Sequence, residues 1–171
     1  MIILIAGATH TGKTAMAQRL LEKYKFPYLS IDHLKMGLIR SGQTKSSVSD
    51  DEHLTPYLWS IVKEIIKTAI ENGQNLIVEG CYIPFDWKKD FGKDYLMKIR
   101  YYCLIMTKNY IQTHFSDILS NESVVEKRLI RGDLTQDGLI AENERNLQLC
   151  KERGLNYILI DNEYKVDVEI L

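Results

Sequence analysis

The sequence predicts an α/β protein in which helices cover both faces of a parallel β-sheet. Two observations support this fold class. Short, continuous apolar runs alternate along the chain with segments whose apolar residues recur at helical spacing. The first run, "IILIA" at 2–6, is apolar throughout and ends at a glycine, as is typical of a strand buried on both faces.

The first third of the chain contains two predicted strands, each followed by a helix. After the strand at 2–6, helical periodicity predicts a helix from about Lys13 to Lys25. The segment "PYLSI" at 27–31 predicts a second strand, and "DHLKMGLIR" at 32–40 predicts a short helix. The polar residues 41–53 predict a loop.

The rest of the chain continues the alternation. Thr55-Pro56 predicts a helix start, with Thr55 as N-cap and Pro56 in the first turn, and Asn72-Gly73 predicts the end of that helix. The remaining predicted elements are strands at 75–80, 99–106 and 155–161, a helix from Asn121 through Arg131, and a helix from about Leu139 to Arg153 that Gly154 ends.

Length and composition indicate one domain, 1–171, in a cytoplasmic protein. The net charge is −1, so we expect no nucleic-acid partner, because a nucleic-acid backbone selects a basic excess. "MIILIA" is too short for a signal-peptide core, and no apolar segment is long enough to span a membrane. Cys81, Cys103 and Cys150 lack metal-type spacing and predict reduced, buried thiols. Both a monomer and a homodimer remain open.

The loop between the first strand and the first helix reads "GATHTGKT", from Gly7 to Thr14. Its glycines let backbone amides curl around an anion, and the following helix directs its positive end at the same anion. In this pattern the lysine meets the β- and γ-phosphates, and the threonine hydroxyl binds Mg²⁺. We therefore expect ATP and Mg²⁺ as ligands, with nucleotide contacts from Gly7, Thr9, His10, Thr11, Gly12, Lys13 and Thr14.

On this loop and on its order of elements, the chain resembles the P-loop kinases of the adenylate-kinase-like kind. The resemblance implies a three-layer P-loop NTPase sandwich whose five-stranded parallel sheet has the order 2-3-1-4-5. It also implies transfer of the γ-phosphoryl group of ATP to a small molecule. A GTPase is disfavoured, because "TKNY" at 107–110 has a tyrosine where an aspartate would read guanine.

The same resemblance assigns roles to two further regions. Glu79 ends the strand in "NLIVEG" and matches the family's acid that supports Mg²⁺. A lid-like segment at about 120–138 contains Arg128 and Arg131, which would stabilise the charge on the transferring group. Arg145 could add to them. A turn-capping role for Glu79 and a solvated basic helix face remain the alternatives.

The acceptor site is expected on a loop region at about 32–55. Here the chain also resembles shikimate, gluconate, chloramphenicol and zeta-toxin-type kinases, in which an aspartate after the second strand activates the acceptor hydroxyl. Asp32 stands at that place, although it could also be the N-cap of its helix. His33, Lys35 and Arg40 are candidate substrate-binding residues.

The sequence thus predicts a phosphotransferase, an ATP- and Mg²⁺-dependent kinase acting on a small hydroxyl-bearing or phosphorylated metabolite. One alternative is a nucleoside monophosphate kinase, although "EGCYIP" lacks the arginine that those enzymes carry after the third strand. A second alternative, from another class, is a non-catalytic module that binds nucleotide and regulates a partner.

Overall fold

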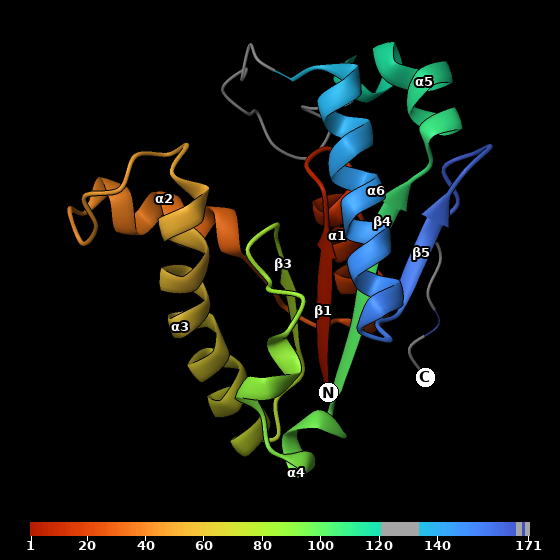
Figure 1. Cartoon of the computed structure of the whole chain (residues 1–171). Helices are drawn as coiled ribbons and strands as arrows, with labels where there is room; N and C mark the ends of the chain where they lie inside the picture. The colour runs from red at the N-terminus through yellow and green to blue at the C-terminus, as the bar shows by residue number, and fades with distance from the viewer. Residues whose placement is uncertain (121–133, 167–168, 170–171) are drawn as a thin grey trace.

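The computed structural model describes residues 1–120, 134–166 and 169, and its centre is one five-stranded sheet (Figure 1). All strand pairs are parallel, and the order β2-β3-β1-β4-β5 confirms the predicted topology. The strands are β1 (Ile2–Gly7), β2 (Tyr28–Ser30), β3 (Leu76–Glu79), β4 (Ile99–Met106) and β5 (Tyr157–Ile160).

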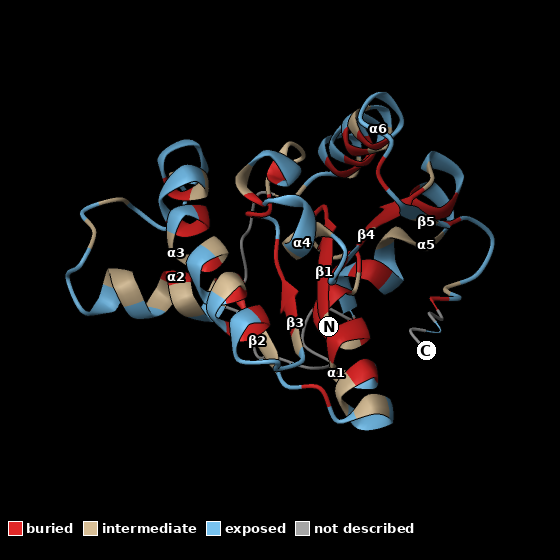
Figure 2. Cartoon of the chain, turned by 90° about the horizontal axis from the view of Figure 1, so that it is seen from below, coloured by how far each residue is buried: buried red, intermediate tan, exposed pale blue. Residues whose placement is uncertain are grey.

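Helices pack on both faces of the sheet, and α1 and α6 lie on opposite faces (Figures 1 and 2). The helices are α1 (Lys13–Tyr24), α2 (Ile31–Arg40), α3 (Asp51–Glu71), the 3₁₀ helix η1 (Trp87–Asp90), α4 (Lys93–Leu96), α5 (Lys108–Ser120) and α6 (Gln136–Glu152). None of the helices in the described ranges combines the length and apolarity needed to cross a bilayer.

The core is divided into two clusters by the central strand β1, every residue of which is buried (Figure 2). Ile2 and Leu4 belong to a cluster with the buried residues of α3, whereas Ile3 and Ile5 belong to a cluster with those of α1. Because side chains alternate between the faces of a strand, an all-apolar run serves both clusters at once. This explains why β1 could be recognised from its sequence.

The start of α3 differs from the prediction. The helix begins at Asp51, one turn before Thr55-Pro56, so the loop comprises residues 41–50. Asp51 and Glu52 place negative charge at the positive end of the helix, and the Thr55 hydroxyl donates to the Asp51 carbonyl at 2.7 Å. Leu54 is fully buried, so core packing includes this extra turn in the helix and leaves Pro56 inside it.

Two helices near the C-terminal half also differ from expectation. α6 begins at Gln136 rather than near Leu139, because the Thr135 hydroxyl caps it by accepting from the Gly138 N–H at 3.1 Å. α5 was not expected from the sequence, because its few buried apolar residues give a weak periodic pattern. The helix predicted at 121–131 lies outside the described residues.

The cysteines only partly match the prediction. All three thiols are free, and Cys103 and Cys150 are buried as expected, but Cys81 is exposed. Cys81 follows β3 on the loop that leads to η1, so its exposure comes from its place at the edge of the sheet rather than inside it.

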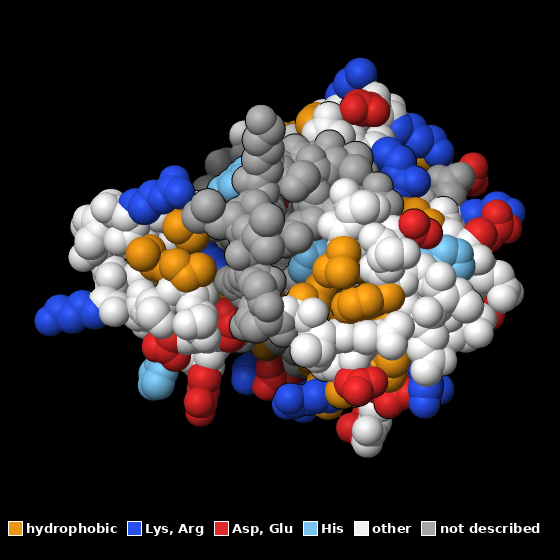
Figure 3. Space-filling view, turned by 90° about the horizontal axis from the view of Figure 1, so that it is seen from above, with side chains coloured by type: hydrophobic (Ala, Val, Ile, Leu, Met, Phe, Trp, Pro, Cys, Tyr) orange, Lys and Arg blue, Asp and Glu red, His pale blue; other side chains and the backbone are white. Residues whose placement is uncertain are grey.

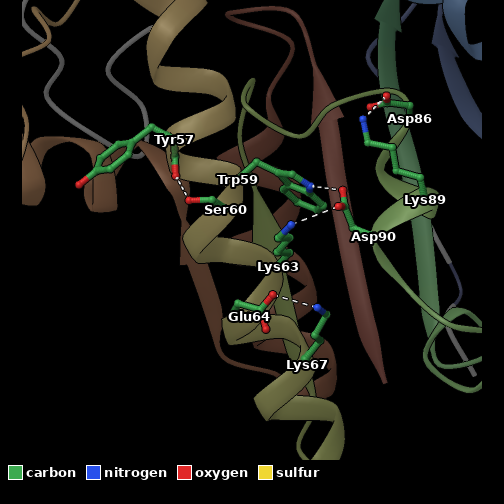
Figure 4. A network of polar contacts seen from close by, with 9 residues as sticks. All are labelled: Tyr57, Trp59, Ser60, Lys63, Glu64, Lys67, Asp86, Lys89 and Asp90. Carbon is green, nitrogen blue, oxygen red and sulfur yellow. Dashed lines mark hydrogen bonds and ion pairs between the residues drawn. The ribbon is translucent and has the colours of Figure 1, made fainter.

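Asp90 joins α3 to the segment that follows β3 (Figure 4). Its carboxylate accepts from the Trp59 indole N–H at 2.9 Å and from the Lys63 ammonium at 3.2 Å. Burial alone would raise the pKa of Asp90, but the hydrogen bonds from Trp59 and Lys63 outweigh it and lower the pKa below its ordinary value. This contact helps hold α3, and with it the adjacent α2, against the sheet.

Candidate functional site

The glycine loop lies where β1 ends and α1 begins, at the edge formed by the carboxyl ends of the strands (Figure 1). In open parallel sheets this edge is where ligands bind. Gly7 and Gly12 have φ angles of 143° and 81°. A Cβ at Gly7 would lie 2.6 Å from the Leu104 carbonyl oxygen, so the chain requires glycine here to pass close to β4.

Side chains inside the loop hold its shape. The Thr11 hydroxyl donates to the Ala8 carbonyl at 2.9 Å, and the Lys13 ammonium donates to the same oxygen at 2.6 Å. Thr9 Oγ1 and His10 Nδ1 are 2.9 Å apart, and His10 adopts a φ of 62°. Lys13 is only 4% exposed, so its charge is enclosed within the loop.

Thr14 and Glu79 are brought together by the pairing of β1 with β3. Ile5 of β1 is in register with Glu79 at the end of β3, and Thr14 is the second residue of α1. The Thr14 hydroxyl donates to Glu79 Oε1 at 3.4 Å, and Glu79 is fully buried. The predicted pair of metal-binding residues is thus adjacent in the structure, and both groups offer the oxygen ligands that Mg²⁺ prefers.

The surroundings of Lys13 favour its charged form. Burial opposes the charge, whereas Cys81, Glu79 and Asp32 favour it, and the balance raises the pKa of Lys13. Although Cys81 is exposed, desolvation of its thiol is the main reason that its own pKa is raised, so the thiol is neutral at neutral pH. The carboxylates of Glu79 and Asp32 therefore supply the compensating charge.

A second polar chain extends from α2 to the start of α3. The Lys35 ammonium is 3.5 Å from Asp32 Oδ1 and donates to the Tyr82 hydroxyl at 2.7 Å. That hydroxyl in turn donates to Asp51 Oδ1 at 2.8 Å. Burial, reinforced by Asp51, raises the pKa of Tyr82, and Lys35 is only 3% exposed. Lys35 is therefore a buried cation held between Asp32 and Tyr82.

The other predicted acceptor residues are more dispersed. Asp32 lies in the first turn of α2, and Ser30, not Asp32, occupies the N-cap position. His33 is exposed and points away from Asp32, because consecutive helical residues do not share a face. Arg40 is exposed in the last turn of α2, about 12 Å along the helix from Asp32 by the helical rise per residue.

The structure describes the lid-like segment at about 120–138 only at its two ends. Arg128 and Arg131, with most of the segment 120–138, lie outside the described residues. Arg145 lies on α6 and is exposed.

Two residues near the loop were not singled out from the sequence. Glu142, on α6, lies close to the loop at Thr9, and although the residue is exposed, partial desolvation of its carboxylate raises its pKa. Tyr164, after β5, contacts the loop at Thr11 and Gly12. No sequence signal identifies either residue, because each reaches the loop only through tertiary folding.

The edge of the sheet that carries these residues has no strong charge of one sign in the parts drawn in colour. Figure 3 views it from above and shows basic and acidic side chains interspersed around the rim. Within residues 1–120 and 134–166, no three His, Cys, Asp or Glu side chains gather as a ready-made metal centre. A cation at this site would depend on Thr14 and Glu79 together with oxygens of a bound ligand.

The strand order and the glycine loop define the P-loop kinase fold class. Two solved structures share the fold. A gluconokinase from Sinorhizobium meliloti 1021 superposes with a TM-score of 0.55 at 12% identity, covering 93% of this chain and 81% of its own. A kinase described as putative, from Chloroflexus aurantiacus, superposes with a TM-score of 0.54 at 17% identity, covering 97% and 91%.

The family follows from the sequence itself. The sequence model of the zeta toxin family matches residues 1–104, which include the glycine loop, the helix that carries Asp32, and Glu79. The chain therefore belongs to the zeta toxin family. No curated protein sequence matches it.

Proposed function

We propose that this protein is an ATP- and Mg²⁺-dependent kinase that transfers the γ-phosphoryl group to a hydroxyl of a small molecule. The observation that carries the proposal is the position of Asp32 in the first turn of α2, directly after β2, which places it at the same edge of the sheet as the glycine loop. An acceptor hydroxyl that binds at this edge, beside the phosphates, needs a base, and Asp32 supplies a carboxylate there.

In the proposed reaction Asp32 accepts the proton of the acceptor hydroxyl. The hydroxyl oxygen then forms a bond to the γ-phosphorus of ATP while the bond from that phosphorus to the bridging oxygen breaks, and ADP leaves. Lys13 and the loop amides bind the β- and γ-phosphates. Thr14 and Glu79 would hold Mg²⁺, which neutralises charge on the phosphate oxygens. Arg128 and Arg131 are proposed to stabilise the transferring group.

The charges on the acceptor side favour a neutral hydroxyl over a phosphorylated acceptor. Among the described residues, Asp32 and Asp51 present carboxylates there, and the buried Lys35 already contacts Asp32 and Tyr82. An incoming phosphate would meet these carboxylates and would have to compete for Lys35. We therefore assign Lys35 to orienting Asp32, and His33 and Arg40 to outer contacts with the acceptor.

The test is phosphoryl transfer from Mg-ATP to a panel of alcohols, sugars, amino sugars and nucleoside monophosphates. Asp32→Asn should retain ATP binding but lower kcat by about 10²–10⁴, the usual contribution of a general base. Lys13→Ala should abolish turnover, and Asp94→Asn, a change of the same type on the exposed helix α4, should leave turnover unchanged.

Other outcomes of the same experiment would remove the base role or favour an alternative function. Unchanged turnover in Asp32→Asn would remove the base role. Phosphorylation of a nucleoside monophosphate, independent of Asp32, would identify a nucleotide kinase. Tight ATP binding without transfer to any acceptor would favour the regulatory module.

A further inference from the structure

The segment after β5 returns across the sheet edge to the glycine loop. The Thr107 hydroxyl donates to Asp161 Oδ1 at 2.8 Å, which fixes the start of the segment beside the end of β4. Val166, at its other end, is 4% exposed and packs into the cluster that contains α1. Tyr164 lies between these two anchors, so its place against the loop is set from both sides.

The Tyr164 hydroxyl contacts two consecutive carbonyl groups of the loop. It lies 3.2 Å from the Thr11 oxygen and 3.4 Å from the Gly12 oxygen, and it donates its hydrogen between them. A Cβ built on Gly12 would lie 2.0 Å from the hydroxyl oxygen and 2.8 Å from the ring carbon that bears it. The phenol therefore fills the space that a side chain at position 12 would need.

The chemistry of the peptide bond gives this contact a consequence for ligand binding. A peptide unit is planar and trans, so its C=O and the N–H of the next residue point in opposite directions. The Thr11 carbonyl shares a plane with the Gly12 N–H, and the Gly12 carbonyl shares one with the Lys13 N–H. The Gly12 oxygen also accepts a hydrogen bond from the Met16 N–H at 2.9 Å, so the start of α1 already fixes the Lys13 N–H. Tyr164 holds the Thr11 oxygen at 3.2 Å, and holding this oxygen on one side fixes the Gly12 N–H on the other side.

We propose that Tyr164 is a positioning residue for phosphate binding, which orients the Gly12 amide by hydrogen bonding to the carbonyl oxygen of Thr11. This inference rests on the proposed function, because the Gly12 amide is among the donors that a glycine loop presents to the phosphates of a nucleotide. Donation to a carbonyl also polarises its peptide unit and strengthens the N–H as a donor.

The environment of Tyr164 keeps its hydroxyl available as a donor. Burial is the main reason that its pKa is raised, and Arg19, whose guanidinium lies 5.8 Å from the ring centre, works in the opposite direction. The net effect keeps the hydroxyl protonated at neutral pH. The phenol therefore donates throughout the neutral pH range.

The experiment compares Tyr164→Phe with the wild type. The variant keeps the ring that packs against Gly12 and removes only the hydroxyl. Isothermal titration with Mg²⁺-pyrophosphate and with Mg-ADP measures the two dissociation constants. We expect both to rise by about 2- to 10-fold, the effect of one neutral hydrogen bond.

Tyr95→Phe is the matched control. Its hydroxyl donates to Glu71 at 2.6 Å at the opposite edge of the sheet, where α3 ends (Figure 1). The Tyr95→Phe variant should leave the dissociation constants for both ligands unchanged. Pyrophosphate has no base or ribose, so an equal loss for both ligands is specific to the phosphate-binding amides.

Three results would overturn the inference. Wild-type affinity of Tyr164→Phe for both ligands would exclude the positioning role while leaving the proposed kinase function intact. A loss for Mg-ADP but not for pyrophosphate would mean that Tyr164 contacts the nucleoside rather than orienting the loop. Failure of the wild-type protein to bind either ligand would remove both the inference and the proposed function.

Discussion

Replacing Tyr82 by phenylalanine should lower the free energy of unfolding more than a typical loss of one hydroxyl group. The Tyr82 hydroxyl accepts from the Lys35 ammonium at 2.7 Å and donates to the Asp51 carboxylate at 2.8 Å. Tyr82 and Lys35 are 4% and 3% exposed, so water cannot readily replace the lost contacts. Phenylalanine would leave a buried ammonium with Asp32 at 3.5 Å as its described ionic partner.

The magnitude follows from the two bonds. A hydrogen bond to a buried charged group contributes about 1.5–3 kcal/mol, which is the expected cost at Lys35. Asp51 is exposed at the start of α3, so losing that bond should cost at most about 1 kcal/mol. The sum is about 2–4 kcal/mol, and with an m-value of about 2 kcal/mol/M the urea midpoint should fall by about 1–2 M.

The assay is urea unfolding followed by circular dichroism, with Tyr95→Phe as control. Tyr95 also donates to a carboxylate, that of Glu71, but this bond is exposed, so its loss should cost less than about 1 kcal/mol. A Tyr82→Phe midpoint equal to that of Tyr95→Phe would refute the reasoning. Lys35→Met in the Tyr82→Phe background should cost much less than in the wild type, because the two residues share one interaction.

Two further predictions concern stability. Asp90→Asn should cost about 1–3 kcal/mol at pH 7, because the carboxylate accepts from Trp59 and Lys63. The folded-state pKa of Asp90 lies below its unfolded value of about 4, so this stabilisation is present above that pH and is lost as the pH falls through the folded-state pKa. The wild-type and variant melting temperatures should therefore converge in acid, and a constant gap would contradict the assignment. Leu58→Ala, at a fully buried position of α3, should lower the free energy of unfolding by about 3–5 kcal/mol. Leu119→Ala, at a position that is 41% exposed, should lower it by less than about 1 kcal/mol. Equal losses of the two variants on urea unfolding would contradict the placement of Leu58 in the core.

Much of the fold could be predicted because its signals are local. β1 is recognisable from the continuous apolar run at 2–6, and the glycine loop from spacing alone. The start of α3 was misjudged because Thr55-Pro56 is a strong local start signal, whereas the actual start depends on packing of Leu54. α5 was missed because its packing surface consists of few apolar residues.

The candidate site was predictable in part for the same reason. Lys13, Thr14 and Asp32 follow predicted strands and Glu79 lies at the end of one, and carboxyl ends of parallel strands meet at one edge of the sheet. Their roles remain proposals. The acceptor-binding role of Lys35 stays a prediction, and its contact with Tyr82, which lies 47 residues further along the chain, could not be foreseen from local sequence.

By itself, the sequence determined the class of sheet, the glycine loop and the strand ends that carry the candidate residues, because strand periodicity and loop chemistry are written in neighbouring residues. Only the tertiary structure decided which side chains support that loop. Tyr164 reaches the Gly12 carbonyl across 152 residues of sequence, and Glu142 reaches Thr9 from α6. Such contacts depend on how strands and helices pack around β1, and this packing cannot be predicted from the pattern of neighbouring residues.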